Sequence, residues 1–95
     1  MSYPKIIERL ARGEKVTIRP SGNSMTPRIK NKQEITISPI SSFDVGDVVL
    51  AKVSGRYYIH LVSAVDGDRV QISNNHGHVN GWTHRTKVFG IVKDV

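Results

Sequence analysis

Two residues of this chain could together break a peptide or ester bond: a serine in a predicted turn and a histidine in a predicted strand. Ser24 lies in the run Pro-Ser-Gly-Asn-Ser-Met-Thr-Pro at 20–27, whose residue types favour a tight turn. His60 lies in the strand-like run Tyr-Tyr-Ile-His-Leu-Val at 57–62. A serine hydroxyl becomes nucleophilic when a neighbouring base removes its proton. The pair therefore predicts a serine nucleophile with a histidine base.

Such a nucleophile also needs hydrogen-bond donors for the negative charge that develops on the substrate oxygen. The backbone N–H groups of the turn and the hydroxyl of Ser21 are the candidates. Two other interpretations stay open, because Ser24 could be an ordinary loop residue and His60 an ordinary hydrogen-bonded strand residue. Lys52, on the preceding predicted strand, is the rival base, and that role requires burial to lower its pKa.

The elements that must position these residues are one helix and several short strands. Apolar residues at helical spacing predict a short N-terminal helix over residues 3–12. Period-two or continuous apolar runs predict the strands, which are expected at 16–18, 35–38, 48–53, 57–65, 69–73 and 88–92. Residues 74–85 are polar and rich in Gly and Asn, and are expected to be irregular. The pattern indicates a mostly β fold, a small coiled antiparallel sheet or barrel, in a single domain over 1–95.

Composition excludes several classes of protein. The chain has no cysteine, which rules out disulfides and thiolate metal sites. His76, His78 and His84 suggest a metal site, but no cysteine or well-placed carboxylate completes a ligand set, so neither a metal nor a cofactor is expected. No apolar run is long enough to span a membrane, and the N-terminus is too charged for a secretory signal. The expectation is a cytoplasmic protein without a membrane anchor.

The net charge of +6 lies entirely within residues 1–32, around the Ser24 turn. This excess would attract an anionic partner, either a nucleic acid or an acidic protein segment. Arg19, Arg28 and Lys30 are the candidate contacts, and Trp82 could stack on a base or close a peptide groove. The alternative is that the basic residues are merely solvated and that Trp82 covers the edge of the core.

Five sequence blocks, in order, resemble the LexA-like and signal-peptidase serine proteases. They lie at residues 21–27, 43–49, 58–62, 67–70 and 88–92. The resemblance implies a coiled β fold over 15–93 and a Ser/base dyad whose third, acidic member is not obligatory. Ser24 falls on the nucleophile position. His60 falls where most members have lysine, and where the endoplasmic-reticulum and archaeal signal peptidases have histidine.

The sequence departs from that family at several positions. Leu61 follows the histidine where the histidine-type branch has arginine, and Asn74 stands where an acid would orient the base. Neither an N-terminal DNA-binding domain nor a membrane anchor is expected. The resemblance therefore implies a soluble peptidase that uses Ser24 and His60 on an extended peptide or protein substrate, with Ser21 at the oxyanion. The alternatives are a domain that kept the fold and lost the activity, and a non-catalytic module that binds an anionic partner.

Overall fold

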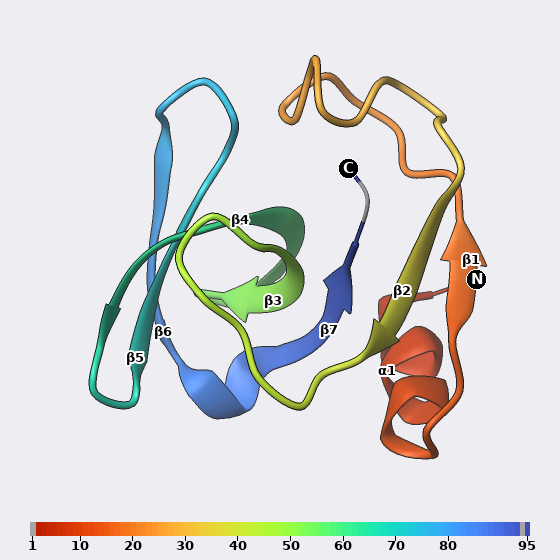
Figure 1. Cartoon of the computed structure of the whole chain (residues 1–95), viewed down its shortest axis with the longest axis horizontal. Helices are drawn as coiled ribbons and strands as arrows, with labels where there is room; N and C mark the ends of the chain where they lie inside the picture. Colours follow the sequence, from red (N-terminus) through yellow and green to blue (C-terminus); the bar gives the residue numbers. More distant parts are fainter. Residues whose placement is uncertain (1, 94) are drawn as a thin grey trace.

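Seven strands form one antiparallel sheet in a computed structural model of the protein, which describes residues 2–93 and 95. The order across the sheet is β1-β2-β7-β3-β4-β5-β6, and the sheet coils around itself (Figure 1). The strands are β1 (Val16–Ile18), β2 (Ile35–Pro39), β3 (Val48–Val53), β4 (Arg56–Asp66), β5 (Arg69–Ser73), β6 (Val79–His84) and β7 (Val88–Val92). The predicted mostly β fold with one N-terminal helix is confirmed.

Strand β6 corrects the expectation that residues 74–85 are irregular. It pairs antiparallel with β5, and a single 3₁₀ turn, η1 (Arg85–Lys87), follows it. An edge strand buries little of its surface, so its sequence needs no strong apolar alternation. Gly81, at a φ of +140°, and a register shift between Ile72 and Ser73 obscure the pattern further. Residues 74–85 are polar, as noted from the sequence, yet part of this stretch forms a strand.

The central strand β3 is buried on both faces, as its continuous apolar sequence predicts. Its alternate side chains enter two separate apolar clusters. The first core consists of Ile6, Leu10, Val16, Met25, Ile29, Ile35, Ile37, Val48, Leu50, Ile59 and Val92. The second core consists of Val49, Ala51, Val53, Val62, Val70, Ile72, Val88 and Ile91. Both faces of the sheet at β3 are therefore buried by apolar side chains.

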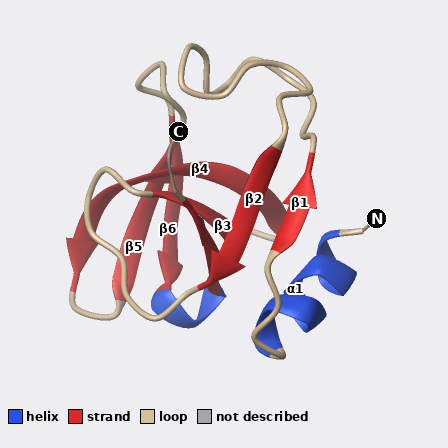
Figure 2. Cartoon of the chain, turned by 45° about the vertical axis from the view of Figure 1, so that its right-hand side comes forward, coloured by secondary structure: helices blue, strands red, loops and turns tan. Residues whose placement is uncertain are grey.

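Helix α1 (Tyr3–Ala11) lies beside the sheet (Figure 2). It closes the first core by burying Ile6 and Leu10. Its close approach to the sheet depends on Gly90 of β7. A Cβ at that position would lie 3.0 Å from a Leu10 methyl carbon and 2.5 Å from Ile37. The absence of a side chain at residue 90 thus lets α1 pack against the sheet. Within the described residues, no helix has both the length and the apolar composition to cross a membrane.

Strand β4 changes partners along its length, which matters for the site it carries. Residues 56–61 pair with β3, and residues 61–66 pair with β5. A register shift between Val62 and Ala64 accompanies the second pairing. The side of residues 56–60 that faces away from β3 is consequently an open strand edge within the described residues. His60 lies at the end of this open edge.

Candidate active site

The turn that carries Ser24 is held by its own hydrogen bonds and by the first core. The N–H of Gly22 donates to Asn31 Oδ1 at 2.9 Å, and the N–H of Lys32 donates to the carbonyl of Pro20 at 2.8 Å. Directly after Ser24, the side chain of Met25 enters the first core, where it is almost fully buried. Ser24 itself is exposed. The turn is therefore held in place by these contacts, and it exposes the hydroxyl of Ser24 to solvent.

His60 reaches the same place from the middle of β4. Its cross-strand partner is Val49, which is fully buried, and the ring of Tyr58 lies 5.0 Å away between centroids. Only 7% of His60 is exposed. Alternation along the strand sends Ile59 into the first core and Val62 into the second. The histidine therefore lies at the boundary between the two cores, where the chain can hold its ring rigidly.

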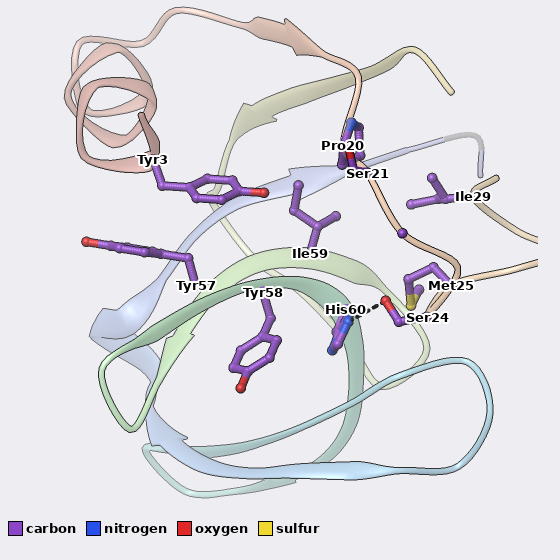
Figure 3. A pocket seen from close by; sticks show the side chains of 11 residues that line it. Tyr3, Pro20, Ser21, Ser24, Met25, Ile29, Tyr57, Tyr58, Ile59 and His60 are labelled. Atoms are coloured by element: carbon purple, nitrogen blue, oxygen red, sulfur yellow. Dashed lines mark hydrogen bonds between the residues drawn. The ribbon is translucent and has the colours of Figure 1, made fainter. Parts of the chain in front are cut away.

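Three side chains from separate parts of the sequence form one hydrogen-bonded chain. Ser24 Oγ lies 2.9 Å from His60 Nε2, and His60 Nδ1 lies 2.6 Å from Asn80 Oδ1 (Figure 3 draws the first of these contacts). An amide oxygen can only accept a hydrogen bond, so Nδ1 carries the hydrogen. In the neutral ring Nε2 is then unprotonated and accepts the hydroxyl hydrogen of Ser24. This is the arrangement in which imidazole acts as a base toward serine.

The surroundings of His60 lower its pKa below the usual value for histidine. Burial is the largest cause, because it penalises the charged ring, and the nearby His78 acts in the same direction. The hydrogen bond to Asn80 opposes both effects, since it favours the protonated ring. The net result keeps His60 neutral near pH 7, and neutral imidazole is the form that can take a proton.

Candidate donors for an oxyanion lie in the same turn. Among the described residues, no hydrogen bond uses the backbone N–H of Ser24. The exposed Ser21 lines the same pocket as Ser24 and His60. The turn thus offers one backbone donor and one hydroxyl near the nucleophile, as its sequence suggested.

A pocket of about 140 Å³ opens beside the Ser24–His60 pair (Figure 3). One wall comes from the Ser24 turn and another from the open edge of β4. The lining residues are Tyr3, Pro20, Ser21, Gly22, Ser24, Met25, Ile29, Tyr57, Tyr58, Ile59 and His60. Tyr3 of α1 stacks on Tyr57, with 5.5 Å between ring centroids. An N-terminal helix therefore contributes to the pocket, a role that its amphipathic pattern did not reveal.

Two of the predicted site residues lie elsewhere. Asn74 Oδ1 accepts hydrogen bonds from the backbone N–H groups of His76 and His78, at 2.9 Å each, so Asn80 rather than Asn74 meets His60. Lys52 Nζ lies 5.1 Å from the ring centroid of Tyr57, as a cation–π contact, while the hydroxyl of Ser24 is bound to the histidine. Sequence reasoning missed Asn80 because it treated residues 74–85 as irregular.

The four residues predicted to bind an anionic partner have different local contacts. Arg19, after β1, pairs with Glu34 at 2.8 Å. Arg28 donates to the backbone carbonyls of Gly46 and Val95, at 3.3 and 3.0 Å. Lys30 and Trp82 are exposed, and Trp82 lies on the edge strand β6 with Arg69 at 5.7 Å. Binding of a nucleic acid or an acidic protein through these residues stays a prediction.

The three histidines considered as metal ligands have other surroundings. His76 contacts the Ser24 turn, and His84 accepts a hydrogen bond from the N–H of Thr86 at the start of η1. No group of three or more His, Asp or Glu side chains in the described ranges, 2–93 and 95, is arranged to hold a metal ion.

Comparison with known proteins identifies the family of the chain. Signal peptidase I S from Bacillus subtilis (strain 168) is 30% identical over 64 residues, which cover 63% of this chain and 35% of that protein. The chain thus spans about a third of the relative's length. No solved structure gives a significant match. The sequence pattern of the family described as Peptidase S24-like matches residues 3–92, nearly the whole chain, and the protein belongs to that family.

Proposed function

We propose that the protein is a serine peptidase in which Ser24 is the nucleophile, His60 the general base and Asn80 the residue that orients the base. The observation that carries the proposal is the hydrogen-bonded chain from Ser24 Oγ through both ring nitrogens of His60 to Asn80 Oδ1. The family description and the name of the Bacillus subtilis relative, which both denote peptidases, support it.

The reaction follows from the positions of the protons. Ser24 Oγ attacks the scissile carbonyl carbon while His60 Nε2 takes the hydroxyl proton. The negative oxygen of the tetrahedral intermediate is stabilised by the N–H of Ser24 and the hydroxyl of Ser21. His60 then gives its proton to the leaving amine, and an ester to Ser24 remains. Water attacks this ester, with His60 again as the base, and releases the acid and the free serine.

Asn80 has a different task from an aspartate in the same place. Its amide oxygen accepts the Nδ1 hydrogen and so selects the productive tautomer, which is the orienting part of the role. Being neutral, it stabilises the imidazolium less than a carboxylate would. Because burial has already lowered the pKa of His60, the ring is a weaker base that works at lower pH.

The substrate is an extended peptide that adds to the open edge of β4. Both backbone groups of Val62 point to the β3 side of β4, because its N–H donates to the carbonyl of Asp47 at 2.9 Å and its carbonyl accepts from the N–H of Gly46 at 2.8 Å, in the turn before β3. Alternation along the strand then directs the backbone groups of Ile59 away from β3 and toward the pocket. A peptide paired with Ile59 would pass beside Ser24, since both residues line this pocket.

The test is cleavage of a mixed peptide library by the wild-type protein and by Ser24→Ala, followed by mass spectrometry of the products. We expect wild type to give defined products and the variant to lose them. A Ser21→Ala variant, altered in the same turn, should keep the same cleavage positions at a lower rate. Identical product patterns from wild type and Ser24→Ala would refute the proposal.

A further inference from the structure

The connection between β5 and β6, residues 74–78, lies against the Ser24 turn. The backbone N–H of Asn75 donates to the carbonyl of Ser24 at 2.9 Å. The side-chain Nδ2 of Asn75 donates to the carbonyl of Thr26 at 3.0 Å. His76 Nε2 lies 3.0 Å from the carbonyl of Asn23 and 3.2 Å from Thr26 Oγ1. These contacts hold the nucleophile and the residues on either side of it.

The polarity of the His76 contact can be assigned. The carbonyl of Asn23 can only accept, so His76 Nε2 carries a hydrogen and donates it. The hydroxyl of Thr26 also donates to the same carbonyl, at 2.9 Å, and its oxygen remains free to accept from the ring. His76 therefore links residues 23 and 26 of the Ser24 turn to each other through its side chain.

The connection itself is pre-formed by Asn74. Its Oδ1 accepts from the N–H groups of His76 and His78, and its own N–H donates to the carbonyl of His78 at 2.9 Å. A closed ring of this kind fixes the direction in which the two following side chains leave the backbone. Residues 74–78 thus form a hydrogen-bonded loop, and the side chains of Asn75 and His76 contact the Ser24 turn.

The same connection leads directly into β6, where Asn80 holds His60. One segment of fewer than ten residues therefore contacts both members of the Ser24–His60 pair, the serine through Asn75 and the histidine through Asn80, while His76 contacts Asn23 and Thr26 on either side of the serine. These two members otherwise belong to parts of the chain that are distant in sequence. We propose that Asn75 and His76 are positioning residues that set the place of Ser24 relative to His60.

This inference rests on the proposed peptidase function, and it concerns orientation rather than contact with substrate, because neither residue lines the pocket. A displacement of the nucleophile on the order of 1 Å can lower a catalytic rate about 100-fold. We expect His76→Ala to reduce kcat by about 10- to 100-fold with little change in KM. His76→Gln, whose side-chain amide can still donate, should restore much of kcat.

The test combines peptide cleavage with hydrogen exchange at residues 22–28, in wild type, His76→Ala, His76→Gln and Asn75→Asp. Asn75→Asp keeps the shape of the side chain but removes its Nδ2 donor. His76→Gln is the matched control, because its side-chain amide can still donate to the carbonyl of Asn23. We expect faster exchange and lower kcat in His76→Ala and Asn75→Asp, and near wild-type behaviour in His76→Gln.

The two measurements separate this inference from the function on which it rests. If wild type cleaves no peptide, the peptidase proposal fails, and exchange alone decides whether Asn75 and His76 hold the turn. Unchanged exchange at residues 22–28 in both His76→Ala and Asn75→Asp would overturn the inference whatever the activity. Faster exchange with an unchanged kcat would also overturn it, because the contacts would then not position the nucleophile.

Discussion

The two members of the proposed catalytic pair, Ser24 and His60, are held in place by different physical means. His60 lies in a strand whose backbone is paired and whose neighbours Ile59 and Val62 enter the two cores. Ser24 lies in an exposed turn that is tied to the first core by Met25 and to the β5–β6 connection by hydrogen bonds. The base is thus fixed by regular structure, and the nucleophile by tertiary contacts. A strand with a regular apolar pattern, such as β4, is specified by its own sequence, whereas the position of a turn depends on what packs around it.

The largest expected effect comes from removing either member of the pair. We expect Ser24→Ala and His60→Ala each to reduce kcat for peptide cleavage by at least about 10³-fold, and the double variant to lose little more, because the two residues act as a unit. The variants should differ in stability. Ser24 is exposed, so its loss should leave Tm unchanged, while loss of the buried His60 should cost about 1–3 kcal/mol. Steady-state kinetics of all three variants measures the loss of kcat, and thermal unfolding measures the change in stability.

A double variant whose rate is the product of the two single effects would contradict this prediction. It would show that Ser24 and His60 act independently. Equal losses of Tm in the two single variants would in turn contradict the contrast between an exposed turn and a buried strand.

A smaller loss is expected from the residue that orients the base. Asn80→Ala removes the acceptor of the Nδ1 hydrogen, so the ring can rotate or change tautomer. We expect kcat to fall by about 100-fold, with KM nearly unchanged. Asn74→Ala is the informative comparison, since its side chain organises the β5–β6 connection and does not touch the ring. The two variants should differ in the ring-nitrogen chemical shifts of His60 measured by NMR.

The pH dependence of kcat/KM tests the environment of His60. Since burial lowers the pKa of His60, the acidic limb of kcat/KM should lie below the usual histidine value of about 6.5. Asn80→Asp places a negative charge beside Nδ1, so the pKa of His60 should rise and the limb should move to higher pH. A pH–rate profile of both proteins measures the shift. A limb that stays in place in Asn80→Asp would exclude His60 as the titrating group.

The same lowered pKa affects stability, in a direction that follows from proton binding. The folded protein binds a proton at His60 less readily than the unfolded chain does. The contribution of His60 to the free energy of unfolding is therefore fully present above about pH 6.5, and it is lost as the pH falls toward the lower pKa of the folded state. Urea titrations at several pH values should show this loss in wild type and a smaller one in Asn80→Asp.

The smallest effect should distinguish the two cores. Ile29 of the first core lines the pocket beside the Ser24 turn, and Ile72 of the second core lies in β5. Replacing either by valine should cost about 0.5–1.5 kcal/mol of stability. Only Ile29→Val should also lower kcat, by a few-fold, because it loosens the support of the turn. Equal kcat values in the two variants at matched loss of stability would argue against this difference.

The contrast also explains what the sequence alone could predict. Period-two runs and glycine links located β3, β4, β5 and β7, because burial on a sheet imposes a short, local pattern. The pairing of Ser24 with His60 was expected from their residue types and from a resemblance, and the structure places Ser24 Oγ 2.9 Å from His60 Nε2. Asn80 was missed, since an edge strand with a glycine carries a weak signal. Tyr3 was missed because its place in the pocket depends on how α1 packs across the sheet.

The Asn80–Gly81 pair has a consequence for the chemical lifetime of the protein. Gly81 has a φ of +140°, and a Cβ there would lie 3.1 Å from a methyl carbon of Val53, so the backbone favours glycine after the orienting asparagine. Asparagine followed by glycine is the dipeptide most prone to deamidation, because the unhindered glycine nitrogen can attack the side-chain amide. In the folded chain Asn80 lies between the paired residues Val79 and Gly81, and its amide oxygen is bound to His60, which keeps the side chain from the cyclic geometry that the attack requires. Storage under conditions that disrupt β6 would therefore favour deamidation of Asn80, within the proposed catalytic site.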